Sequence, residues 1–178
     1  MVYYYDSKEQ AAGYAMGKKL KSLMGNHPKA SSSIVLLCIG SDRSTGDSLG
    51  PLIGYKLSKR QSRNLTIYGT LEYPVHAINL GDTLEGIYKR HPSSLIIAVD
   101  ASLGSFSHIG YVTLGTGSLK PGLGVNKELP EVGDIYITGI VNFSGLLDNL
   151  LLQSTRLATV MNLADCISIG LASALIYK

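Results

Sequence analysis

The sequence predicts an α/β fold in which helices pack against a mostly parallel sheet. Two unbroken apolar runs, Ile34–Ile39 and Leu95–Val99, are typical of strands that are buried on both faces of such a sheet. Segments of helical composition alternate with the predicted strands, and this alternation indicates a layered α/β architecture. The chain has 178 residues without an internal repeat or linker, so we expect a single domain over residues 1–178.

The first half of the chain contains a helix, a buried strand, a loop and a second helix. Ser7–Met24 is rich in Ala, Lys, Gln and Met and predicts a helix, which Gly25–Pro28 ends. After the strand Ile34–Ile39 comes a polar, glycine-rich loop over Gly40–Gly50. Because proline favours the first turn of a helix, Pro51 predicts a helix from Asp47 or Leu49 to Lys59.

The remaining elements continue the alternation. They are a strand over 65–70, a short strand or extended loop over 75–80, a helix over 83–90 capped by Asp82, a strand over 95–99 that ends at Asp100, strands over 111–114 and 135–141, and helix from Gly145 onward. The segment Gly115–Gly133 is long enough for a flap over a binding site.

Composition excludes several classes of protein. With 45% hydrophobic and 16% charged residues, the chain is neither disordered nor a coiled coil. We see no apolar run near the ~18 residues that a membrane span needs and no secretory signal, so we expect a cytoplasmic protein with no membrane partner. A net charge of +3 is too small to indicate nucleic acid. Cys38 and Cys166 both lie in apolar stretches and predict buried, inert thiols.

The strongest candidate site is a pair of aspartates, Asp47 and Asp100. Asp47 follows the first buried strand at the mouth of a helix, and Asp100 ends the second. Ligands of open α/β sheets bind beyond the carboxyl ends of the strands, where both residues are expected. Two close carboxylates cannot both ionise freely, so the pair can act as acid and base. The same pair can hold a divalent metal if a further ligand lies nearby.

Structural roles compete with this interpretation. Asp47 is equally explained as a helix cap, and Asp100 as an anchor for a loop. Asp42 is a third acid in the same loop, where pairing with Arg43 or capping a turn explains it better.

Other residues are weaker candidates for the site. His108 follows Asp100 and is the histidine placed to join the pair, whereas His27, His76 and His91 lie in turns or a possible strand. Asn142 and Ser144 either line the pocket or cap the helix near Gly145, and we favour capping.

Two familiar nucleotide-binding motifs are absent from the sequence. The Gly40–Gly50 loop lacks the Gly-Lys-Ser/Thr of a P-loop and does not form the dinucleotide-binding fingerprint. The helix that follows the loop can still bind an anion at its amino end.

Two segments resemble the germination (spore) protease family and its smaller, YyaC-like sporulation relatives. These segments are Thr45–Pro51, which reads Thr-Gly-Asp-Ser-Leu-Gly-Pro, and Ile96–Ala101, which reads Ile-Ile-Ala-Val-Asp-Ala. The resemblance runs from about Ser33 to Ile169, and hydrogenase maturation endopeptidases are more distant relatives. It implies a phosphorylase/hydrolase-like, three-layer α/β/α fold.

The resemblance also implies a function. Asp47 and Asp100 match the essential aspartates of germination protease, which implies an endopeptidase that acts on small acid-soluble spore proteins in the spore interior. In the hydrogenase peptidases the matching acids bind nickel together with a histidine. This sequence has no histidine after the Tyr111 strand, where that ligand is expected, so we expect no required cofactor. The alternatives are a non-catalytic binding protein with this fold and a metal-dependent maturation peptidase.

Overall fold

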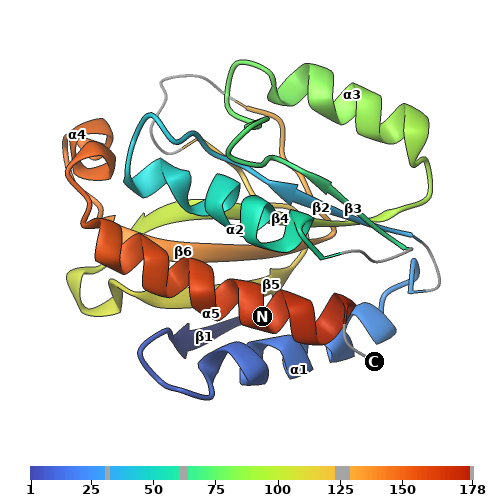
Figure 1. The fold of residues 1–178 in the computed structure, drawn as a ribbon, viewed down its shortest axis with the longest axis horizontal. Coiled ribbons are helices and arrows are strands. Elements are labelled where there is room, and N and C mark those ends of the chain that lie inside the picture. Colours follow the sequence, from blue (N-terminus) through green and yellow to red (C-terminus); the bar gives the residue numbers. More distant parts are fainter. Residues whose placement is uncertain (31–32, 61–63, 123–128, 177–178) are drawn as a thin grey trace.

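One mixed sheet forms the centre of the molecule. The computed structural model describes residues 1–30, 33–60, 64–122 and 129–176. Within them the strand order is β1-β5-β6-β4-β2-β3, where β6, β4, β2 and β3 are parallel neighbours and β5 runs antiparallel to both β6 and β1 (Figure 1). The strands are β1 Val2–Asp6, β2 Ile34–Cys38, β3 Leu65–Tyr68, β4 Leu95–Gly104, β5 Tyr111–Thr116 and β6 Ile135–Phe143. The expected mostly parallel sheet is confirmed.

Helices cover both faces of the sheet. They are α1 Ala12–Gly25, α2 Leu49–Ser58, α3 Leu80–Arg90, α4 Asp148–Gln153 and α5 Leu157–Leu175. Figure 1 shows α1, α2 and α5 on one face and α3 on the other. Alternate residues of β2 face the two layers: Leu36 joins the core beneath α1, α2 and α5, while Val35 and Leu37 join the core beneath α3. The three-layer α/β/α prediction is therefore confirmed, and two apolar cores share one sheet.

The length and apolar character of α5 come from its place in the core. By length and composition alone it is the one helix of the described residues that could cross a membrane, which corrects the expectation that no segment qualifies. Half of it is buried in the protein. It lies against α1 so closely that a Cβ on Gly13 would sit 2.7 Å from the carbonyl oxygen of Cys166. This packing accounts for its apolar residues without a membrane.

The N-terminus differs from the prediction. Val2–Asp6 forms an edge strand paired with β5, and the helix begins at Ala12 rather than Ser7. Aromatic and β-branched residues favour strands. However, an edge strand is only partly buried, so β1 lacks the continuous apolar run that identified β2 and β4.

Strand β4 is longer than predicted. It continues through Asp100 to Gly104, because β6 pairs with it along this whole length. Strand β2 ends earlier, with Cys38 opposite Val99. The backbone of Asp100 therefore lies in the sheet just beyond the end of β2, rather than at the end of its own strand.

The predicted boundaries of two helices were also wrong. The C-terminal helix is interrupted between α4 and α5, where Arg156 adopts an extended conformation with ψ 124°. Helix α3 begins at Leu80, so Asp82 lies in its first turn and Asn79 is the capping residue. The segment over 75–80 forms no strand, although Val75 makes one parallel bridge to Ile39.

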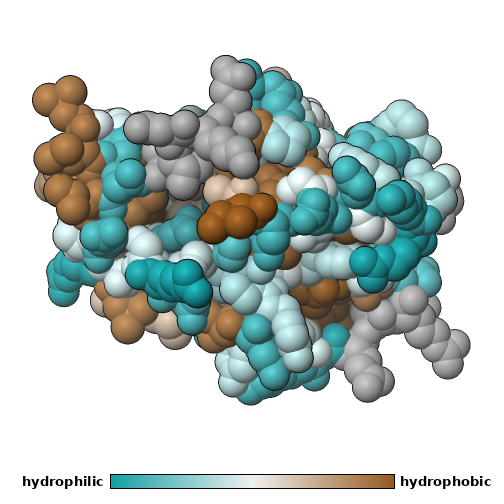
Figure 2. Space-filling model, turned by 90° about the horizontal axis from the view of Figure 1, so that it is seen from above, coloured by the Kyte–Doolittle hydropathy of each residue, from teal (hydrophilic) through white to brown (hydrophobic). Residues whose placement is uncertain are grey.

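An exposed apolar patch lies at the α4 end of the molecule. Leu146, Leu147 and Leu150 are large apolar side chains open to solvent, and Figure 2 shows brown atoms gathered at this end. The other side of α4, which carries Leu152, faces inward. This short helix therefore lies between an exposed apolar surface and the interior of the protein.

Candidate active site

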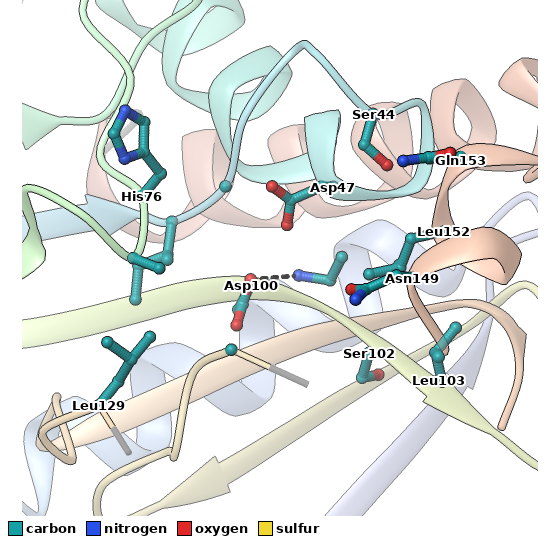
Figure 3. Close-up of a pocket in the computed structure, with 15 residues that line it drawn as sticks. Ser44, Asp47, His76, Asp100, Ser102, Leu103, Leu129, Asn149, Leu152 and Gln153 are labelled. Carbon is teal, nitrogen blue, oxygen red and sulfur yellow. Dashed lines mark hydrogen bonds between the residues drawn. The ribbon is translucent and has the colours of Figure 1, made fainter. Parts of the chain in front are cut away.

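A pocket of about 320 Å³ opens at the carboxyl ends of β2 and β4. Both predicted aspartates line it, and their carboxyl groups face the same space (Figure 3). Asp47 comes from the short 3₁₀ turn Gly46–Ser48 before α2, and Asp100 comes from β4. The structure thus brings together the pair that the sequence singled out.

Asp100 is the more deeply buried member of the pair. The residue is 6% exposed, and its Oδ1 accepts a hydrogen bond of 2.8 Å from the backbone N–H of Ala101. Burial raises the pKa of Asp100 well above its usual range, and the negative charge of Asp47 raises it further. Backbone N–H groups of Ala101 and Gly122 oppose this rise. Asp100 therefore keeps its proton to a higher pH than an ordinary aspartate.

Asp47 is held by a tight turn. The backbone N–H of Ser41 donates to its carbonyl oxygen at 3.1 Å. The start of α2 also lies directly on the end of β2, because a Cβ on Gly50 would be 2.0 Å from the carbonyl oxygen of Ile39. Burial raises the pKa of Asp47, while a backbone hydrogen bond from Ser41 and the charge of His76 lower it. Asp47 is half-buried, and these opposing effects leave it the member of the pair that ionises more readily.

Neutral polar groups form the wall opposite the aspartates. Asn149 and Gln153 lie one turn apart on α4, so that their side chains share one face of the helix. The hydroxyl of Ser44 is buried and has no hydrogen-bond partner among the described residues. Such donors and acceptors suit the amide groups of a peptide. The sequence analysis did not identify these residues, although the spacing of Asn149 and Gln153 was available as a signal.

The histidine prediction was wrong. His108 is exposed, its Nδ1 lies 2.7 Å from the Ser105 hydroxyl, and its ring contacts those of Tyr4 and Tyr111. It does not line the pocket. His76 lies there instead, since the bridge between the preceding residue and the end of β2 brings this loop to the sheet edge. No local sequence signal predicts such a long-range bridge.

Three other candidates lie outside the pocket. Asp42 is exposed and, among the described residues, forms no ion pair with Arg43. Asn142 donates from Nδ2 to the carbonyl oxygen of Leu151 at 2.9 Å, so it ties β6 to α4. Ser144 donates its backbone N–H to β4. Neither Asn142 nor Ser144 caps a helix start, which corrects the expectation.

The long loop between β5 and β6 borders the pocket through the parts that the structure describes. Leu119 and Val132 pair with each other, and Gly122 and Leu129 line the pocket. The predicted flap depends on residues 123–128, which lie outside the described residues.

The described residues do not fit a metal centre of three protein ligands. They contain no group of three His, Cys, Asp or Glu side chains arranged to hold a metal ion. His76 accepts the backbone N–H of Ile78 at Nδ1 and lies near the carboxylates without completing such a group. Cys38 and Cys166 are free and buried, as expected, and burial raises the pKa of both thiols.

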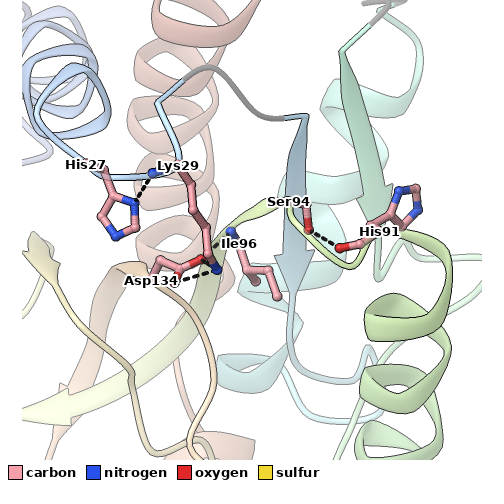
Figure 4. Close-up of polar contacts among 6 residues, drawn as sticks. All are labelled: His27, Lys29, His91, Ser94, Ile96 and Asp134. Carbon is pink, nitrogen blue, oxygen red and sulfur yellow. Dashed lines mark hydrogen bonds and ion pairs between the residues drawn. The ribbon is translucent and has the colours of Figure 1, made fainter.

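A second polar cluster lies at the opposite, amino-terminal edge of the sheet (Figure 4). Asp134 accepts the backbone N–H of Ile96 at 2.9 Å and pairs with Lys29 at 2.9 Å. His27 accepts the backbone N–H of Lys29, and the Ser94 hydroxyl donates to a backbone carbonyl. Because each of these polar groups has a partner within the chain, the cluster stabilises the fold rather than offering a site.

The fold is shared with a solved peptidase. The chain is similar to the [NiFe] hydrogenase maturation protease HycI from Thermococcus kodakarensis KOD1, with a TM-score of 0.53. The likeness covers 86% of this chain and 98% of the other, at 15% sequence identity. At that identity the likeness establishes the α/β/α architecture alone.

Sequence comparison identifies closer relatives. The chain is 46% identical over 176 residues to the uncharacterized protein YyaC of Bacillus subtilis (strain 168), covering 94% of this chain and 86% of that protein. The family model described as a protein of unknown function (DUF1256) matches residues 2–170. Because this model matches nearly the whole length of the chain, the chain belongs to the DUF1256 family.

Proposed function

We propose that this protein is an aspartate-dependent endopeptidase. The observation that carries the proposal is the meeting of Asp47 and Asp100 in one pocket, where the charge of one raises the pKa of the other. Two carboxyl groups with separated pKa values can serve as base and acid in the same reaction. The pocket also offers neutral hydrogen-bonding groups on Ser44, Asn149 and Gln153 for the peptide backbone.

The proposed reaction assigns one role to each carboxyl group. Ionised Asp47 takes a proton from a water molecule as its oxygen attacks the scissile carbonyl carbon. Protonated Asp100 donates a hydrogen bond to the carbonyl oxygen, which stabilises the charge that develops there. When the C–N bond breaks, the proton held by Asp47 passes to the leaving amine, and the carboxyl groups return to their starting states.

The proposed substrates are small acid-soluble spore proteins, cleaved in the forespore or spore cytoplasm during sporulation or germination. The support is the resemblance of Thr45–Pro51 and Ile96–Ala101 to the germination protease family. A protein or peptide substrate also agrees with the peptidase-like fold. Neither nucleic acid nor a membrane is part of this proposal.

Cleavage of a small acid-soluble spore protein tests the proposal. Wild type is compared with Asp47→Asn and Asp100→Asn, and thermal melts verify that each variant is folded. Loss of one acid–base group is expected to lower kcat by about 10²- to 10⁴-fold. Asp42→Asn is the matched control, because it removes a carboxylate from the same loop outside the pocket. Equal cleavage by wild type and both folded pocket variants would refute the assignment.

A metal-dependent maturation peptidase is the second candidate, favoured by the fold shared with HycI. Repeating the assay with a chelator separates the two candidates. Cleavage that is lost with chelator and restored by a divalent metal supports the second, whereas indifference to chelator supports the first. If wild type cleaves nothing, the neutral polar wall supports a third role, in which the pocket binds a polypeptide without cutting it.

A further inference from the structure

A second pocket adjoins the aspartate pocket through His76. It has a volume of about 470 Å³ and lies between the end of β3 and the segment Glu72–Asn79. His76 lines both pockets, and its charge acts on the carboxyl group of Asp47. Strand β3 is the last in the sheet order, so no further strand of the described residues covers this side. The two pockets therefore meet at the side chain of His76.

The wall between the pockets is held by hydrogen bonds. Asn79 accepts the backbone N–H of His76 at 2.8 Å and donates to the carbonyl oxygen of Pro74 at 3.0 Å. The carbonyl oxygen of Val75 accepts the backbone N–H of Gly40 at 2.8 Å. Because these bonds fix the segment on both sides of His76, the shape of the second pocket exists before any ligand binds, which lowers the entropic cost of binding.

The lining of the second pocket suits a cation. Glu72 is its one carboxylate, His76 is its one basic residue among the described residues, and no ion pair engages Glu72. Tyr68 and Tyr73 also line it, and the ring of Tyr73 is 72% exposed. Aromatic faces and carboxylates both attract ammonium and guanidinium groups. The ring of Tyr68 already holds the guanidinium of Arg90 at 5.9 Å.

We propose that this second pocket binds a lysine or arginine side chain of the polypeptide whose backbone occupies the aspartate pocket. The aliphatic stem packs on Tyr73, and the charged end meets Glu72. This inference rests on the proposed peptidase function and adds a specificity to it: bonds near a basic residue are cut in preference. Glu72 and Tyr73 are binding residues, so their loss changes KM rather than kcat.

Matched peptides test the specificity. Synthetic peptides from a small acid-soluble spore protein carry Arg, Gln or Glu at one position, which is moved along the chain on either side of the cleaved bond. At the responsive position, wild type is expected to favour Arg over Gln about fivefold in kcat/KM, the upper range for an exposed ion pair. Glu72→Gln is expected to remove this preference, and Glu72→Lys to reverse it towards Glu. Glu85→Gln, an exposed acid on α3 outside both pockets, is the control.

The outcomes separate this inference from the proposed function. Cleavage of the Arg, Gln and Glu peptides at equal rates at every position would overturn the basic subsite and leave the peptidase intact. If no peptide is cleaved, the dissociation constants of the same peptides, labelled with fluorescein, test the basic subsite instead. Tighter binding of the Arg peptide than of the Gln and Glu peptides, lost in Glu72→Gln, supports the subsite. Equal binding of all three peptides overturns it. Tyr73→Ala provides a second variant, with an expected loss of about threefold in affinity for the Arg peptide alone.

Discussion

Replacing Asp100 with asparagine should lower kcat by about 10²- to 10⁴-fold and, at neutral pH, make the protein more stable. The substitution keeps the shape of the side chain and removes an ionisable group from a buried position. The proposed role of Asp100 requires a proton whose retention depends on burial and on the charge of Asp47. Function and stability therefore make opposite demands on this residue, as is common at active sites.

The size and sign of the effect follow from proton linkage. The pKa of Asp100 is raised in the folded protein from its usual value of 3.8. Between these two pKa values the folded chain holds a proton that the unfolded chain has released. The free energy of unfolding therefore falls by about 1.4 kcal/mol for each pH unit of rise within that window. The stabilisation is complete below the unfolded pKa and is lost as the pH passes the folded pKa. The Asp100→Asn variant would lack this slope, because an amide does not titrate.

Urea denaturation at a series of pH values from about 4.5 to 8 measures this slope. The difference in free energy of unfolding between Asp100→Asn and wild type is expected to grow with pH and then level off. In Asp47→Asn the neighbouring charge is gone, so the pKa of Asp100 falls and the curve levels off at lower pH. Asp42→Asn corrects for the loss of one surface charge.

One result would refute this reasoning. If Asp100→Asn and wild type show parallel stability curves throughout this pH range, the carboxyl group of Asp100 has an ordinary pKa in the folded protein. The acid role assigned to it would then have no physical basis, whatever the cleavage assay shows.

Four further predictions concern the scaffold. Asp134→Ala leaves a buried backbone N–H of β4 without its acceptor and should lower the free energy of unfolding by about 2 kcal/mol in urea melts, whereas Lys29→Met should cost less than about 1 kcal/mol because that ion pair is partly exposed. Gly50→Ala places a Cβ 2.0 Å from a backbone carbonyl oxygen, so it should displace the start of α2, destabilise the fold by about 1–3 kcal/mol and impair cleavage. Cys38 and Cys166 should react with the thiol reagent DTNB only after unfolding, since both are buried; rapid labelling of the native protein would contradict this. A single domain should unfold in one transition with coincident circular dichroism and fluorescence changes.

The sequence by itself determined the central layers of the fold. A strand buried on both faces must be apolar at every position, so Ile34–Cys38 and Leu95–Val99 were visible as continuous runs. Asp100 stood out because it directly follows such a run, and Asp47 because it lies in the polar loop after the other run, at the start of a helix. Their convergence followed from a general property of parallel sheets, whose carboxyl ends lie at one edge.

Tertiary structure decided the rest. The length of β4 depends on its register with β6, and the strand β1 exists because β5 offers a partner edge. Likewise, His76 rather than His108 reaches the pocket because a bridge joins Val75 to Ile39. Each of these outcomes is set by hydrogen bonds between segments far apart in the chain. The local sequence indicates the secondary structure and the burial that a residue prefers. It does not indicate which distant segment will supply the partners for the backbone hydrogen bonds of that residue.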